Sequence, residues 1–191
     1  MFRVVLVLLA CAISCRAFAQ QTAAPESEQD VLRAVAISQV LGSKLADAVQ
    51  SDRKFDLATL MNFSALSPLL EADSCPKLIY TAYTVPLDTG GMRVYILGAN
   101  RDDRSVVIGR HFSVNLAGNA ADLGSLTSST KACVIMEKSK SGAPLFISHL
   151  MSTIPSEFHV YVSIAQAASL FVSTPSGIWA VKEGQIRKVQ R

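Results

Sequence analysis

Three histidines are the side chains of this sequence whose chemistry could support metal binding or proton transfer: His111, His149 and His159. His111 and His159 each fall on the polar side of an alternating segment, which predicts that they project from the polar faces of strands. On neighbouring strands, the two imidazoles could hold a metal ion with Glu157 or Asp88 as a carboxylate ligand. Separate solvated histidines are the alternative. Spacing cannot place two strands side by side, so no metal site is assigned.

Arg110 occupies a position where the sequence pattern calls for an apolar residue. The apolar series around it is Val106, Ile108, Phe112, Val114 and Leu116. An arginine that points into a core needs a carboxylate partner or an anionic ligand. Alternatively, Gly109 permits a bulge that turns Arg110 outward. The sequence therefore names Arg110, His111 and His159 as candidate ligand-binding residues, with the bulge and a structural ion pair as the competing interpretations of Arg110.

Four well-marked catalytic motifs are absent from the sequence. There is no GxGxxG or GxxxxGK[ST] loop, and no GxSxG or HExxH pattern. A Ser-His-acid triad needs three groups to meet in space, and the many serines of this chain make such a pattern uninformative. We therefore assign no catalytic residue and no cofactor.

The first 19 residues have the pattern of an export signal. A cationic start at Arg3 precedes an apolar run over 4–14, and residues 17–19 read Ala-Phe-Ala, which a signal peptidase cleaves. The prediction is a signal peptide over 1–19 and a periplasmic or secreted protein. A lipid anchor at Cys11 or Cys15 is the alternative for this segment.

Two cysteines, Cys75 and Cys133, remain after the predicted leader. An even pair in an oxidising compartment predicts a disulfide. On the chain-entropy model, closing a loop of about 60 residues would contribute about 4 kcal/mol to the free energy of unfolding. Two unpaired buried thiols are the alternative.

Removing the leader changes the charge of the chain. Arg3 and Arg16 go with it, which takes the formal charge from +3 to +1, with 16 basic and 15 acidic residues. A nearly neutral chain gives no electrostatic reason to expect nucleic-acid binding. No later apolar stretch reaches 18 residues, so no transmembrane segment is predicted.

Hydrophobic periodicity divides the remaining chain into a helical part and a strand part. Residues 20–29 are polar and predict a flexible lead-in, and 30–191 a single domain. Spacing of 3.6 predicts a helix from about 26–30 to 50, then a second over 56–66 and a short turn at 69–72. Gly42 weakens the first helix and could mark a bend.

Period-two alternation takes over after Cys75. The predicted strands are 78–85, 92–97, 105–116, 132–136, 145–150, 157–164, 170–173, 178–181 and 186–189. The small, polar residues 117–130 predict a long loop. Helices followed by hairpin-linked strands predict an α+β fold, with two N-terminal helices packed on a mostly antiparallel sheet of about seven or eight strands.

These features favour binding over catalysis. We expect an exported, non-catalytic module that binds a protein partner in the cell envelope, of which an inhibitor or immunity-type protein is one version. A small-ligand-binding domain with a pocket between helices and sheet is the alternative, as is a hydrolase without short motifs. Trp179, the only tryptophan, is expected in the core.

Overall fold

A computed structural model describes residues 27–61, 67–102, 104–117, 120–138 and 141–189. The predicted signal peptide, Cys11, Cys15 and most of the predicted lead-in lie outside these ranges. The export signal therefore stays a prediction, and the lipid anchor stays the alternative to it.

Four helices are found in the described part of the chain: α1 (Glu28–Gln50), α2 (Leu57–Met61), α3 (Ser67–Asp73) and α4 (Glu157–Ala165). The first confirms the long N-terminal helix. It begins after Ser27, whose hydroxyl accepts a hydrogen bond from the N–H of Asp30, so the helix has the side-chain cap that its first turn requires. Acidic Glu28 and Asp30 in that turn suit the helix dipole.

The largest sheet is antiparallel and has five strands. They are β1 (Lys54–Phe55), β2 (Ile79–Pro86), β3 (Met92–Ala99), β5 (Phe112–Ala117) and β6 (Ala120–Ser128), in the order β1-β2-β3-β5-β6. The predicted hairpin is confirmed as β2 and β3, whose register places Pro86 opposite Met92. Gly90 and Gly91 in the connecting turn both have positive φ, a conformation that glycine adopts without strain.

Two smaller sheets complete the described strands. One pairs β4 (Ser105–Val107) with β7 (Ile135–Glu137). The other consists of β8 (Leu145–Ser148), β9 (Leu170–Thr174), β10 (Gly177–Lys182) and β11 (Gln185–Lys188), in the order β11-β10-β9-β8. We call it the C-terminal sheet. Its strands β8 and β9 are parallel, and the connection between them contains α4.

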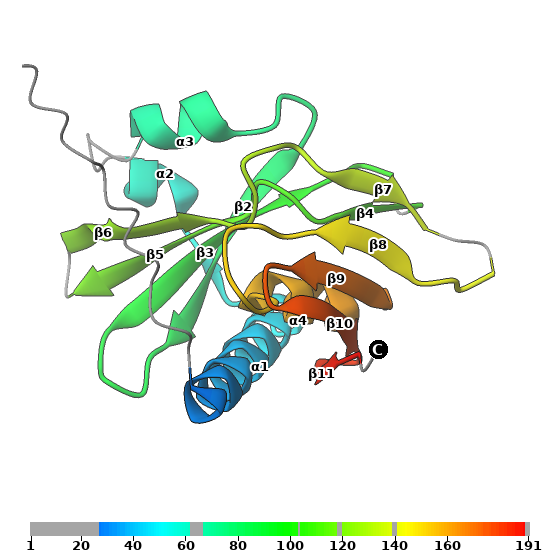
Figure 1. The fold of residues 1–191 in the computed structure, drawn as a ribbon. Coiled ribbons are helices and arrows are strands. Elements are labelled where there is room, and N and C mark those ends of the chain that lie inside the picture. Colours follow the sequence, from blue (N-terminus) through cyan, green and yellow to red (C-terminus); the bar gives the residue numbers. More distant parts are fainter. Residues whose placement is uncertain (1–26, 62–66, 103, 118–119, 139–140, 190–191) are drawn as a thin grey trace, which may run out of the picture.

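The helices divide between the two faces of the five-stranded sheet. Figure 1 shows α1 and α4 on one side and α2 and α3 on the other. The larger core lies with α1 and α4 and includes Leu45, Tyr95, Val160 and, as expected, Trp179. The smaller core lies under α3 and includes Leu70, Ala82, Val94, Ile96, Phe112, Val114 and Leu116. Both faces of this sheet are therefore covered.

The α+β class with mostly antiparallel strands is confirmed, but a single sheet of seven or eight strands is wrong. The described residues form eleven strands in three sheets. The count of two helices before the sheet is also wrong, because residues 67–73 form a helix of their own. The remaining differences fall at three segments.

Residues 157–164, predicted as a strand, form α4. The alternation was misleading because this helix is buried nearly all round: every residue from Phe158 to Ser163 is buried. A helix enclosed on all sides needs no polar stripe, so its period of 3.6 is weak in the sequence.

The long strand predicted over 105–116 is interrupted. β4 ends at Val107 and β5 begins at Phe112, and between them Arg110 adopts φ 60°. A Cβ on Gly109 would lie 2.5 Å from the carbonyl oxygen of Ala132, so only glycine fits this close approach. The predicted bulge is thus a complete break that sends the chain from one sheet to another.

Residues 117–130, predicted as a loop, contain β6. Its small and polar residues have weak intrinsic preference for strands. Pairing with β5 determines the structure here: Ala117 lies opposite Ala120, and Phe112 opposite Ser128. The tertiary context therefore overrides local propensity.

Gly42 marks a close contact between helices rather than a bend. A Cβ at this position would lie 2.4 Å from the Cβ of Val160 and 2.6 Å from the carbonyl oxygen of Glu157. Glycine therefore allows α1 and α4 to approach more closely than any other residue would permit. This contact fixes the first turn of α4 against α1.

Cys75 and Cys133 form the predicted disulfide, with Cα atoms 5.8 Å apart. It joins the segment before β2 to the segment before β7. No helix within the described ranges is long and apolar enough to cross a membrane.

Candidate functional site

Arg110 lies at the strand break and not in the core. Its guanidinium forms an ion pair with Asp73, the last residue of α3, at 2.9 Å. Its N–H donates to Thr130 Oγ1. The structure thus shows the outward turn and an ion pair together, and ligand binding by Arg110 stays a prediction.

His111 is fully buried beside Phe158 and Tyr161. Its Nδ1 accepts the N–H of Gly98, and its Nε2 donates to the carbonyl oxygen of Val107. Both ring nitrogens are therefore engaged by backbone groups. Burial lowers the pKa of His111 to about 4, so the ring is neutral at pH 7.

His159 lies in the first turn of α4 and is also buried. Its ring Nδ1 accepts the backbone N–H of Ser156, and the backbone N–H of His159 donates to the carbonyl oxygen of Ser156. Burial, with a smaller contribution from His149, lowers the pKa of His159 to about 3. The reciprocal bonds with Ser156 fix the start of the helix.

His149 is the histidine that reaches a pocket. Its ring packs edge-on against that of His159, with centroids 4.7 Å apart. His149 Nε2 lies 3.0 Å from Ser152 Oγ, a distance at which a base could activate a hydroxyl. The Ser152 hydroxyl, however, donates to the carbonyl oxygen of Ile154, so His149 is the donor to Ser152. This arrangement does not prepare Ser152 as a nucleophile.

A pocket of about 250 Å³ opens between the first turn of α4 and the strands β3, β5 and β6 of the five-stranded sheet. Its hydroxyl groups come from Ser113, Ser125, Thr127, Ser128, Ser129, Ser152 and Ser156. Arg93, Glu157, His149, Met151 and Phe158 complete the lining. We call it the hydroxyl pocket. It brings hydroxyl and charged groups to a face that otherwise belongs to the larger core.

Arg93 and Glu157 form an ion pair at the hydroxyl pocket. Arg93 Nη1 lies 3.4 Å from Glu157 Oε1, and Arg93 Nε donates to Asn115 Oδ1 at 2.8 Å. Their side chains are 24% and 16% exposed, so both charges are largely removed from water. An arginine within an apolar strand is the same signal that singled out Arg110, and at Arg93 it was missed.

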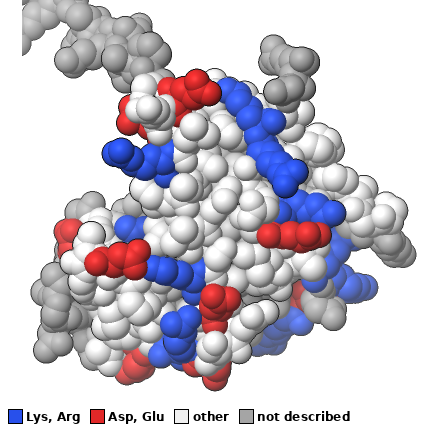
Figure 2. All heavy atoms as spheres, turned by 90° about the horizontal axis from the view of Figure 1, so that it is seen from below, with Lys and Arg blue, Asp and Glu red and all other residues white. Residues whose placement is uncertain are grey.

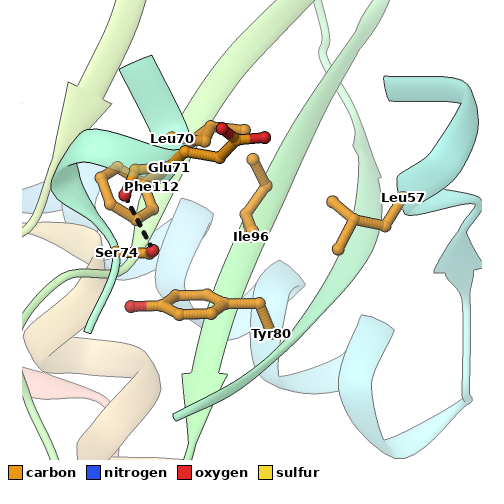
Figure 3. Close-up of a pocket in the computed structure, with 7 residues that line it drawn as sticks. All are labelled: Leu57, Leu70, Glu71, Ser74, Tyr80, Ile96 and Phe112. Atoms are coloured by element: carbon orange, nitrogen blue, oxygen red, sulfur yellow. Dashed lines mark hydrogen bonds between the residues drawn. The ribbon is translucent and has the colours of Figure 1, made fainter. Parts of the chain in front are cut away.

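A second, apolar pocket of about 150 Å³ lies on the other face of the sheet, under α3 (Figure 3). Figure 3 shows Tyr80, Ile96 and Phe112 facing Leu57 and Leu70 across it. The Tyr80 hydroxyl accepts the N–H of Cys75. Hydrophobic groups dominate this pocket, and it belongs to the smaller core.

The described part of the chain contains no group of three or more His, Cys, Asp or Glu side chains that could hold a metal ion. His111 and His159 are near enough to interact electrostatically, but they come from a strand break and a helix, and both ring nitrogens of His111 are engaged by backbone groups. The metal arrangement with Glu157 or Asp88 is therefore not formed.

An exposed apolar surface lies on the outer face of the C-terminal sheet. Phe146 is 70% exposed and stacks on Phe171 of the neighbouring strand, with ring centroids 4.9 Å apart. Ile178 on β10 is 40% exposed. We call these three residues the outer apolar face. On the molecular face seen in Figure 2, by contrast, Lys and Arg alternate with Asp and Glu around an uncharged centre.

No protein-family model, no curated protein and no solved structure matches this chain.

Proposed function

We propose that the protein is an exported, non-catalytic module that binds another protein through the outer apolar face and the adjacent edge of β8. An inhibitor or immunity-type protein would act in this way. The disulfide supports an oxidising compartment. The single observation that carries the proposal is the exposure of Phe146 on an edge strand.

The exposed aromatic pair has the character of a binding surface. Residues on the opposite face of the same strands, Leu170, Val172 and Val181, are fully buried, so the alternation of the strands places Phe146, Phe171 and Ile178 away from the core. Leu150, which follows β8, is 78% exposed. Clustered exposed aromatic and aliphatic groups are typical of protein interfaces.

The backbone of β8 offers a second element of recognition. Leu145 and His149 donate their N–H groups to Ser169 and Ser173 on the β9 side. The alternate residues, Phe146 and Ser148, therefore direct their N–H and C=O groups to the open edge. β8 carries no charged residue to protect this edge. We infer that the partner contributes an extended segment that pairs with β8, as in β-strand addition.

Partner capture with matched variants tests this proposal. Phe146→Ser removes the aromatic group, and Ser148→Pro removes an outward N–H without affecting a bond to β9. Leu32→Ser, at a residue of α1 that is 62% exposed against 70% for Phe146, is the control. A protein retained from an envelope extract by the wild type and by the control, and bound at least tenfold more weakly by both test variants, is the expected result.

The measurement is the dissociation constant of the purified partner. Equal affinity of the wild type and the two β8 variants would exclude this surface as the binding site. Light scattering tests whether two copies of the chain pair through β8 instead. A dimer that the Ser148→Pro substitution abolishes would show self-association in place of a foreign partner.

A further inference from the structure

A second binding function is indicated by the hydroxyl pocket, which is separate from the outer apolar face. One wall is the first turn of α4, where Glu157 and Phe158 both line the pocket. The N–H group of His159 already donates to Ser156, but those of Glu157 and Phe158 precede the first bond of the helix, and N–H groups in that position favour negative charge. The opposite wall is the sheet, where Arg93 supplies a full positive charge. Groups that attract an anionic oxygen therefore converge from two directions.

Glu157 brings a negative charge to the same pocket, which favours a positively charged group of a ligand. Its contact with Arg93 is 3.4 Å, longer than the 2.7–2.9 Å of well-formed charge-assisted hydrogen bonds. Both groups are largely buried, so water compensates neither charge well. Tyr95 is buried close to this pair, and the charges of Arg93 and Glu157 both act on its hydroxyl group. The Arg93–Glu157 contact is therefore a loose one between two charges that have little access to water.

The charges and hydroxyls together define the chemistry of a ligand. A simple anion would be repelled by Glu157 and a simple cation by Arg93, whereas an uncharged sugar would compensate neither. A molecule with a carboxylate and an ammonium group on one carbon would place opposite charges beside both members of the pair. Hydroxyls such as Ser113 and Thr127, which donate as well as accept, suit both ends of such a ligand.

We propose that the hydroxyl pocket binds a small zwitterion of the α-amino-acid class. The carboxylate lies toward Arg93 and the first turn of α4, and the ammonium group lies toward Glu157. The pocket volume of about 250 Å³ limits the ligand to a single small molecule.

Calorimetric titration of the purified, disulfide-bonded protein with glycine, L-alanine and L-serine tests the proposal. Acetate, methylammonium and glucose at equal concentrations are the comparison probes. We expect saturable binding of at least one amino acid and none of the three comparison probes. Saturable binding of acetate, methylammonium or glucose at comparable affinity, or no binding of any amino acid, would overturn the assignment.

Two variants locate the site. Arg93→Gln and Glu157→Gln should each weaken amino-acid binding about tenfold or more, because each removes a charge-assisted contact. Arg104→Gln, at the exposed Arg104–Asp102 pair, should leave binding unchanged. Amide chemical-shift changes in the wild type, expected at β3, β5 and the first turn of α4, supply the same information if a variant does not fold. Shifts confined to other elements would refute the site.

Discussion

The five-stranded sheet and the C-terminal sheet differ in how they are enclosed. In β3, five consecutive residues from Val94 to Gly98 are buried, because helices lie on both faces of the sheet. In β9, buried Leu170, Val172 and Thr174 alternate with half-buried Phe171 and exposed Ser173. The first sheet is therefore an interior element. The second is buried on one face and exposed on the other.

This difference implies that the two sheets respond differently to perturbation. Changes within the doubly covered region should lower the free energy of unfolding, whereas changes on the outer apolar face should alter binding and leave stability nearly unchanged.

Removal of the disulfide should have the largest effect. The bond joins the segment before β2, in the doubly covered region, to that before β7. The double variant Cys75→Ala, Cys133→Ala should lose about 4 kcal/mol of unfolding free energy, because the unfolded chain gains the freedom of a long loop. Urea unfolding of the variant and the wild type measures this. An unchanged midpoint would show that the covered sheet does not depend on the bond.

Acidification should have the next largest effect. In the unfolded chain the pKa of histidine is about 6.5, whereas in the fold the pKa of His111 is about 4 and that of His159 about 3. Below pH 6.5 the unfolded state therefore binds protons that the folded state does not, so stability is complete above this pH and falls as the pH decreases. The two residues together should remove about 3 kcal/mol at pH 5.5.

Unfolding followed by the fluorescence of Trp179 at pH 7.5 and 5.5 checks this value. Because carboxylates titrate mainly below this window, a constant free energy of unfolding between the two pH values would contradict the buried, neutral state of both histidines. His111→Gln should remove about half of the contribution of these two histidines, to which His149, whose pKa burial also lowers, adds in the same direction.

Two matched substitutions, one in each sheet, should have the smallest effects on the free energy of unfolding. They compare the two sheets most directly. Val94→Ala in the covered sheet, at a fully buried residue, should cost about 2 kcal/mol. Phe146→Ser on the outer apolar face should cost less than about 1 kcal/mol, chiefly the loss of its stacking on Phe171. Equal losses in chemical denaturation would mean that the C-terminal sheet needs both faces for stability.

The sequence supports the helical N-terminal part, the β2–β3 hairpin and the disulfide, because each depends on local periodicity, turn residues or cysteine count. It misplaces α4 because a helix buried all round has no polar stripe. It misplaces β6 because pairing with β5, and not propensity, holds small residues in a strand. Both errors arise where tertiary contacts determine local structure.

The candidate sites also divide into one that local sequence signals indicate and one that only tertiary contacts form. Arg110 could be singled out because it interrupts an apolar series. The hydroxyl pocket could not, since its lining comes from four separated parts of the chain: β3, β5, β6 and the residues leading into α4. His111 and His159 were placed on polar faces because no local signal distinguishes a solvated histidine from one whose nitrogens meet backbone groups.

The contact between α1 and α4 has a kinetic consequence. The N–H of Ile186 donates to the side chain of Gln39, 147 residues earlier, and Leu45 and Ala48 of α1 are buried only when the later elements are in place. Contacts of such long range make folding slow. As a ribosome synthesises the chain, the apolar side of α1 emerges early and stays uncovered until α4 and β11 follow. We expect chaperones to recognise the growing chain chiefly at α1 during this interval.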